Sequence, residues 1–325
     1  MKYINLLFIF LIFLSSCAEG GVMDVLDGLY VDSIYIKRDT IVRGPNDSVF
    51  TEIHDTIHKS LNIKIDSIVR YMDQQSVGQT QGASCYNNYL FDVGNNMTYI
   101  HIYDMDVRNL VKRFRSRMSN ILYHCNNACF SNIYYSDEDQ FPLLFVSQQR
   151  TTPKQVHVCR ITGEINEPTL SLVSVIMLPT DNDLFIKNSA DIVLNNDNNT
   201  MYAYAITNND YKLCTYQFDI PDVLNNDSVF LTKQDIKEMH IYNTAYRAKQ
   251  GAVIKNGFLY VVKGIPNRNP LGLTIINLFN HSWKEFDLFD HHFGWEPEGL
   301  FFYNEELYCT TNYNKGVYKI CLSIK

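Results

Sequence analysis

The stretch QGAVIKNGFLYVV, residues 250–262, carries the pattern that decides the fold. Gly251 and Ala252 open an apolar run, Asn256-Gly257 interrupts it, and a second run of aromatic and β-branched residues follows. Asn-Gly between two such runs is a strong short-range signal for a β-hairpin, because both residues tolerate the positive φ that a two-residue turn requires. We therefore predict two antiparallel strands joined by a tight turn.

Similar units recur along the chain, each with a small or polar entry, an apolar strand, a turn and a second aromatic strand. The sequence holds 22 Tyr and 19 Phe, both of which favour strands. Successive units begin roughly 45 to 63 residues apart, a spacing that is typical of four-stranded blades, so we predict an all-β fold. The fold is a β-propeller of about five blades, with six as the alternative, over residues 61–325. The units begin near Gln81, Asn127, Ser189, Gln250 and Glu298.

A small residue stands at the entry of each unit, where the innermost strand starts close to the axis of the predicted ring. Gly or Ala at such a place permits a close approach of neighbouring backbones. We therefore expect these positions to pack tightly near the axis. They are Gly82, Ala128, Ala190, Gly251 and Gly299.

The two ends of the repeat region complement each other. The last unit is one strand short after Gly316–Leu322, and Leu61–Val69 precedes the first unit without a partner of its own. We predict that this N-terminal strand supplies the outer strand of the last blade and closes the ring. Closure also removes two sheet edges, which would otherwise invite aggregation.

The first residues are those of an export signal. Lys2 precedes an apolar run from Ile4 to Leu14, which is shorter than the roughly 20 residues that a membrane span requires. Leu14-Ser15-Ser16-Cys17 resembles the lipobox of bacterial lipoproteins, in which the Cys is lipidated and begins the mature chain. The resemblance implies a signal peptide over residues 1–16 and a membrane partner reached through a lipid anchor at Cys17. An ordinary signal peptide with an accidental Cys is the alternative.

Residues 17–60 differ from the repeats and are predicted to form an extended stalk. A tripeptide of Asp, then Ser or Thr, then an aliphatic residue recurs there and once just beyond. It resembles the O-glycosylation acceptor motif of Bacteroidetes, which implies a glycosylated spacer. The alternative is an ordinary strand that alternates polar and β-branched residues. The acceptor residues would be Ser33, Thr40, Ser48, Thr56 and Ser67.

The net charge of the chain limits the kind of partner that it is expected to bind. The formal net charge is −7, which gives no basis for binding nucleic acid, because that affinity depends on Lys and Arg that neutralise phosphates.

Eight cysteines include Cys17, and most of the others lie in apolar strand-like runs. A thiol in such a run packs as a small hydrophobic group, so we expect free, buried thiols, with one or two disulfides as the alternative.

Two of the entries carry a wider resemblance. Gln250-Gly251 and Glu296-Pro297-Glu298-Gly299, each followed by an aromatic hairpin, resemble propeller lipoproteins of Bacteroidetes. More distantly they resemble the NHL-like and strictosidine-synthase-like propeller superfamily. The resemblance covers roughly residues 62–325 and implies a fold alone, since propellers host binding, hydrolysis, lyase and scaffold roles alike. It transfers no catalytic residue to this chain.

Polar side chains at the entries of the inner strands are expected to converge on one mouth of the central channel. Amide and carboxyl groups of this kind suit hydrogen bonding to a sugar or another neutral polar ligand. Alternatively, they cap strand ends and bond between blades, because backbone groups near the axis need partners. The predicted ligand-binding residues are Gln81, Asn126, Asn127, Asp191, Gln250, Glu296 and Glu298, together with His292 and Trp295.

Reactive side chains are densest in residues 291–298. Trp295 is suited to stacking on a sugar face, but the spacing of the histidines and carboxylates matches no metal signature. We therefore predict neither a metal nor a cofactor. Asp191 and Glu298 would suit a glycosidase, which places its two carboxylates roughly 5–9.5 Å apart. Propeller glycosidases use acidic residues on three inner strands, and amides occupy three of the five equivalent positions here.

The sequence thus predicts an outer-membrane lipoprotein of the cell envelope that acts as a binding or scaffolding module for a glycan or an envelope protein partner. The alternative is a glycan-active hydrolase or lyase that uses Asp191 and Glu298. No motif names a catalytic residue, so an enzyme is the less favoured interpretation. Only one acidic residue, Glu19, directly follows the lipobox, which leaves periplasmic and surface placement open.

Overall fold

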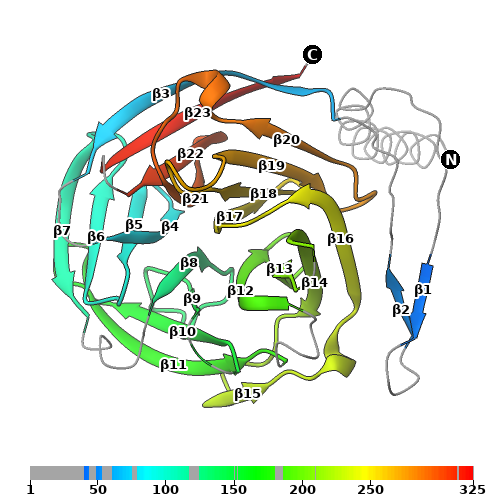
Figure 1. The fold of residues 1–325 in the computed structure, drawn as a ribbon. Helices are drawn as coiled ribbons and strands as arrows, with labels where there is room; N and C mark the ends of the chain where they lie inside the picture. Colours follow the sequence, from blue (N-terminus) through cyan, green and yellow to red (C-terminus); the bar gives the residue numbers. More distant parts are fainter. Residues whose placement is uncertain are drawn as a thin grey trace, which may run out of the picture.

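The computed structural model describes residues 40–43, 49–52, 61–74, 79–116, 124–149, 151, 153–179, 186–208, 210–312 and 315–324. Over these residues the chain is built from β-strands and two short 3₁₀ helices, η1 (Lys233–Asp235) and η2 (Phe289–His291). Five sheets stand in a ring around a central axis, which confirms the predicted five-bladed propeller (Figure 1).

Each blade contains four antiparallel strands in a meander, with the first strand nearest the axis. Blade 1 contains β4 (Thr80–Tyr86), β5 (Tyr89–Gly94), β6 (Tyr99–Asp104) and β7 (Asn109–Arg115), and blade 2 contains β8 (Cys125–Phe130), β9 (Leu144–Gln148), β10 (Gln155–Thr162) and β11 (Thr169–Met177). Blade 3 contains β12 (Ile186–Asn195), β13 (Thr200–Thr207), β14 (Lys212–Asp219) and β16 (Glu238–Ala245), and blade 4 contains β17 (Lys249–Lys255), β18 (Phe258–Lys263), β19 (Gly272–Asn277) and β20 (Trp283–Asp287). Blade 5 contains β21 (Pro297–Tyr303), β22 (Glu306–Thr311), β23 (Gly316–Ile324) and β3 (Ile63–Asp73).

Three further strands lie outside this scheme. The short β15 (Ser228–Phe230) adds to the outer edge of blade 2, where it pairs in parallel with β11. The strands β1 (Thr40–Arg43) and β2 (Val49–Glu52) pair with each other as an antiparallel hairpin within the predicted stalk.

The ring is closed by strands from opposite ends of the chain. β3 and β23 lie side by side at the rim although they are blue and red in sequence order (Figure 1). They pair antiparallel over their whole length, from Ile63 opposite Ile324 to Asp73 opposite Gly316. The predicted closure by the N-terminal strand is therefore confirmed.

The hydrophobic core is divided into five clusters, and each one lies between neighbouring blades. Between blades 1 and 2, for example, Phe91 and Ile100 pack with Phe130 and Val146. The remaining interfaces are filled in the same way, and blades 4 and 5 enclose Ile63 and other side chains of the closing strand. A blade buries its faces only against its neighbours, so the stability of each depends on the completeness of the ring.

A β-bulge interrupts the pairing at the entry of every inner strand. The register shifts fall between Thr80 and Gly82, between Cys125 and Ala128, and at the equivalent places in blades 3, 4 and 5. The glycines there lie against a neighbouring inner strand. A Cβ added at Gly251 would lie 2.2 Å from the carbonyl oxygen of Glu298. The expected close packing at the entries is thus observed.

Several other predictions fall partly or wholly outside the described residues. The signal peptide and Cys17 lie outside them, as do Ser33, Ser48 and Thr56, whereas Ser67 is half-buried in β3.

The seven cysteines that the structure describes are all free, and five of them are buried, which confirms the expected buried thiols. Within the described residues, no helix has the length and apolar character needed to cross a bilayer.

Candidate binding site at the channel mouth

A cavity of about 600 Å³ opens at the end of the channel where the inner strands begin. This volume lies within the range of roughly 300–1,000 Å³ that is typical of small-molecule sites. Its lining comes from several blades and is mostly polar. The lining residues are Gln81, His124, Asn126, Gln149, Ile206, Tyr211, Arg247, Ala248, Lys249, Gln250, Ile265, Asn269 and Glu296.

The entry bulges explain why inner-strand side chains reach this cavity. Gln81, Asn126 and Gln250 each lie inside a bulge, where one strand carries residues that its partner does not pair. A bulge turns a side chain away from the regular alternation of the strand. All three are buried, and they present amide groups to the cavity from blades 1, 2 and 4.

Glu296 provides the acidic group of the cavity wall. Its carboxyl accepts hydrogen bonds from Gln250 Nε2 and Asn312 Nδ2, both at 3.3 Å. Burial raises the pKa of Glu296 above its ordinary value, and the amide donors oppose that shift. The group therefore sits in the wall as a hydrogen-bonding carboxyl held by two amides.

The cationic side of the cavity rests on Lys249, which forms a buried ion pair with Asp191. Asn126 Nδ2 donates to the same Asp191 oxygen at 2.6 Å, and Gln149 Nε2 lies 3.5 Å from it. Burial and the nearby Lys154 lower the pKa of Lys249. Lys249 and Asp191 thus form one buried ion pair, in which each charge lies against its partner.

Asn127 holds three blades together near the axis. Its Nδ2 donates to the carbonyl oxygens of Ile192 at 2.9 Å and Ala252 at 3.2 Å, and its Oδ1 accepts from the Ala252 N–H. These contacts connect β8 with β12 and β17. Asn127 does not line the cavity, and the amide is engaged by backbone on both sides.

Asp191 and Glu298 lie behind the cavity wall. Their exposed fractions are 0 % and 1 %, and neither belongs to the lining. Glu298 Oε1 accepts from Gln81 Nε2 at 3.3 Å, while burial and the neighbouring Glu296 raise the pKa of Glu298 well above its ordinary value. Both carboxyl groups thus bond to side chains of neighbouring blades.

The structure does not bring His292 and Trp295 to the cavity. Both are exposed, at or just after η2, and neither is among the lining residues. Of the predicted ligand-binding residues, Gln81, Gln250 and Glu296 line the cavity together with Asn126.

Sequence reasoning missed the residues that loops contribute. Tyr211 comes from the β13–β14 connection, Arg247 from the β16–β17 connection and Asn269 from the β18–β19 connection. The Arg247 guanidinium lies 5.6 Å from the centre of the Tyr211 ring. Arg247 and Lys249 directly precede the Gln250 entry, and this neighbourhood is the one signal that points to them.

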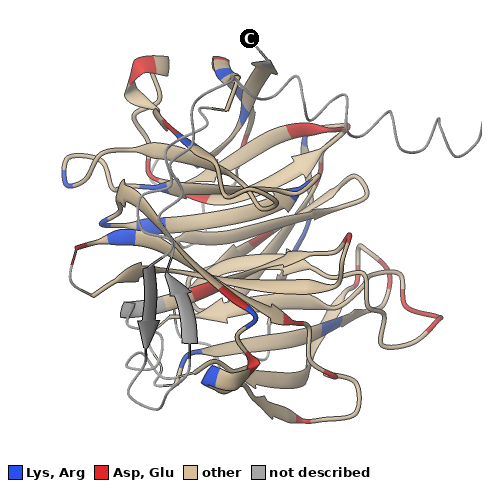
Figure 2. Ribbon diagram, turned by 90° about the vertical axis from the view of Figure 1, so that its right-hand side faces the viewer, with Lys and Arg blue, Asp and Glu red and all other residues tan. Residues whose placement is uncertain are grey.

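Charges of both signs are spread over the strands and loops of the described part of the chain (Figure 2). The cavity lining also contains both signs, because Lys249, Arg247 and Glu296 belong to it and Lys249 pairs with the buried Asp191. The site therefore offers hydrogen bonds and compensated charges to a ligand.

Comparison with known proteins gives similarity in structure alone. No family model matches the chain, and no curated protein is similar to it in sequence. The crystal structure of Myxococcus xanthus glutaminyl cyclase shares 9% identity, covers 81% of this chain and 97% of that chain, and has a TM-score of 0.49. PQQ-bound aldose sugar dehydrogenase from Streptomyces coelicolor shares 8% identity over 80% and 98% of the two chains, with a TM-score of 0.46. Similarity at this level carries no argument about activity.

Proposed function

We propose that this protein is a cell-envelope lipoprotein whose propeller binds a glycan at the mouth of its central channel. The observation that carries the proposal is the cavity of about 600 Å³, in which amide side chains from several blades meet. An amide both donates and accepts hydrogen bonds, as does a sugar hydroxyl. A wall of amides is therefore matched to a ligand rich in hydroxyl groups.

Two further features support a sugar over an apolar or strongly charged ligand. Tyr211 contributes an aromatic side chain to the cavity wall, and the Arg247 guanidinium lies 5.6 Å from the centre of its ring. Lys249 is paired with Asp191, so the charge of this lysine is already matched within the protein. Such a site orients a neutral polar ligand through several directional contacts.

Binding is favoured over glycoside hydrolysis because of where the two candidate carboxylates lie. A glycosidase needs both groups beside the scissile bond. Asp191 and Glu298 are buried behind the wall and engaged with Lys249, Asn126 and Gln81. The lining itself offers one carboxyl group, that of Glu296.

The envelope location belongs to the same proposal. It is supported by the lipobox-like Leu14-Ser15-Ser16-Cys17 and by the acceptor-like tripeptides that follow. In this proposal Cys17 carries the lipid, and an O-glycosylated segment over residues 17–60 separates the propeller from the outer membrane. Metabolic labelling with a fatty-acid analogue tests the anchor, since labelling should be lost in Cys17→Ser.

Glycan-array binding of residues 18–325 tests the function. We expect binding to a defined glycan, and about tenfold weaker binding by Gln250→Ala, which corresponds to the loss of about 1.4 kcal/mol. His292→Ala, which changes an exposed side chain away from the cavity, serves as the matched control. The absence of binding to every glycan would overturn the proposal, as would a Gln250→Ala protein that binds like the parent chain.

A further inference from the structure

Two histidines and a glutamate meet at the outer rim, away from the channel. Glu238 and His240 lie two residues apart on β16, so they share one face of that strand. His281 belongs to the turn between β19 and β20 of the next blade. One potential ligand atom from each residue lies within 4.8 Å of the other two.

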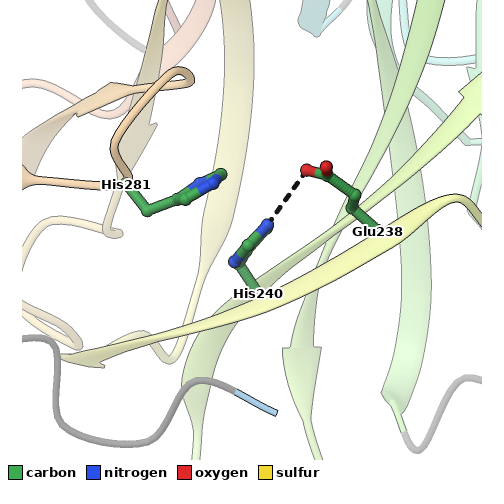
Figure 3. A group of neighbouring side chains, drawn as sticks. All are labelled: Glu238, His240 and His281. Carbon is green, nitrogen blue, oxygen red and sulfur yellow. Dashed lines mark hydrogen bonds and ion pairs between the residues drawn. The ribbon is translucent and has the colours of Figure 1, made fainter. Parts of the chain in front are cut away.

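The separation of Glu238 and His240 fits a shared ion. Figure 3 shows the Glu238 carboxylate directed at the His240 ring, with His281 beside them. His240 Nε2 lies 3.3 Å from Glu238 Oε2. Two ligands at about 2.1 Å from a tetrahedral zinc ion are separated by roughly 3.4 Å, so this pair is already at bonding separation for one metal.

The turn that presents His281 is held by its own hydrogen bonds. Asn277 Oδ1 accepts from the backbone N–H groups of Phe279 at 2.8 Å and Asn280 at 3.2 Å, and the His281 N–H donates to the Asn277 carbonyl at 2.8 Å. Asn280 Oδ1 accepts from Ser282. The backbone conformation of this turn is therefore held independently of the His281 ring.

The His240 ring also carries an unsatisfied polar atom, because its Nδ1 is buried without a hydrogen-bond partner.

We infer that Glu238, His240 and His281 form a binding site for a divalent transition metal that links blades 3 and 4 at the rim. Two imidazoles and one carboxylate are a donor set that zinc and its neighbours prefer, with a fourth position left for water. The site is independent of the glycan proposal. It would stabilise the interface where Lys263 Nζ already bonds to the Ala245 carbonyl at 2.7 Å and to Glu285 Oε1 at 2.6 Å.

Binding requires one local movement. The His240 and His281 rings are stacked, with centroids 3.5 Å apart and an angle of 20° between the planes. A metal lies near the plane of each imidazole that binds it, so a shared ion requires the His281 ring to turn out of the stack. His281 is only half-buried, which allows this rotation about its side-chain bonds.

Cobalt(II) titration of the purified full chain tests the site, because its spectrum distinguishes nitrogen and oxygen ligands from the free thiols. We expect one ion per chain without a sulfur-to-cobalt charge-transfer band. His240→Gln and His281→Gln should each weaken binding at least about tenfold, whereas His292→Gln, which changes an exposed histidine in the β20–β21 connection, should not. Proton NMR should show the imidazole signals of His240 move as the stack opens.

A second measurement guards against a variant that merely fails to fold. Zinc should raise the thermal midpoint of the parent chain and of His292→Gln, and it should leave that of His281→Gln unchanged. His281 lies on a half-exposed turn, so this variant is expected to fold in the absence of metal. Equal affinity in the parent and both ligand variants, a thiolate spectrum, or no binding at all would overturn the inference.

Discussion

Two buried side chains of blade 1 respond to pH in opposite directions. Asp92 on β5 lies opposite His101 on β6, and its carboxylate accepts a hydrogen bond from Gln74 Nε2 at 3.1 Å. Burial raises the pKa of Asp92 to about 7 and lowers the pKa of His101 to about 4. As the pH falls from about 7 to about 4, Asp92 therefore adds to the free energy of unfolding, because the folded chain takes up the proton first. Over the same interval His101 subtracts from it, because the unfolded chain takes up the proton first.

Asp92→Asn separates the two contributions. At pH 8 we expect the variant to be more stable than the parent by about 1–3 kcal/mol, because a buried carboxylate no longer has to ionise. On acidification it should lose stability more steeply than the parent, since His101 then acts unopposed. Urea unfolding at pH steps between 8 and 5 measures both effects. Parallel curves for the two proteins would contradict the assignment of the shifted groups.

Asn127 tests how much one amide at the axis contributes. Asn127→Ala leaves the Ile192 and Ala252 carbonyls and the Ala252 N–H without this partner. We expect a loss of about 2 kcal/mol or more in the free energy of unfolding, because buried backbone groups become unsatisfied. Asn132→Ala is the control, because that amide makes two hydrogen bonds on an exposed residue. Equal losses in the two variants would show that the amide of Asn127 contributes no more to stability than an exposed amide does.

At the level of the strands, the entry bulges depend on glycine where two inner strands meet. A Cβ at Gly251 would lie 2.2 Å from the Glu298 oxygen and 2.8 Å from the Gly299 Cα, which are backbone atoms that cannot move aside. We expect Gly251→Ala to lower the free energy of unfolding by about 1–3 kcal/mol, the usual cost of overpacking. Gly294→Ala is the matched control, since its nearest neighbour would be a Phe289 ring atom at 3.8 Å. Chemical denaturation of both variants measures these free energies of unfolding, and equal losses in the two would contradict the prediction.

The strands were predictable because their signals are local. Asn256 and Gly257 have φ values of 51° and 73°, as the Asn-Gly hairpin signal requires, and the entry glycines are as close to the next strand as their position implied. The cavity was only half predictable. Gln81 and Gln250 sit at repeated positions, whereas Tyr211 and Arg247 come from loops whose paths no periodicity encodes. Likewise, nothing near His240 in the sequence indicates His281, because they meet only when two blades pack together.

For the molecule as a whole, ring closure decides whether the propeller is stable. β3 supplies the last strand of blade 5, and Leu61, Ile63 and Ile65 are buried between blades 4 and 5. Each such side chain contributes roughly 1.5–3 kcal/mol, which is a large part of the 5–15 kcal/mol that stabilises a typical domain. We expect a chain that begins at residue 75 to lose cooperative unfolding, and a chain that begins at residue 61 to keep it. Calorimetry of the two truncated chains makes the comparison, and similar transitions in both would refute the role of β3.

The pairing of β3 with β23 also has a consequence for the time at which the protein can fold. A ribosome releases residues 63–73 well before their partner strand, residues 316–324. Blades 2 and 3 have both neighbours once blade 4 has emerged, but blade 5 cannot be completed until β23 is available to pair with β3. The ring therefore stays open until residues 316–324 have been synthesised.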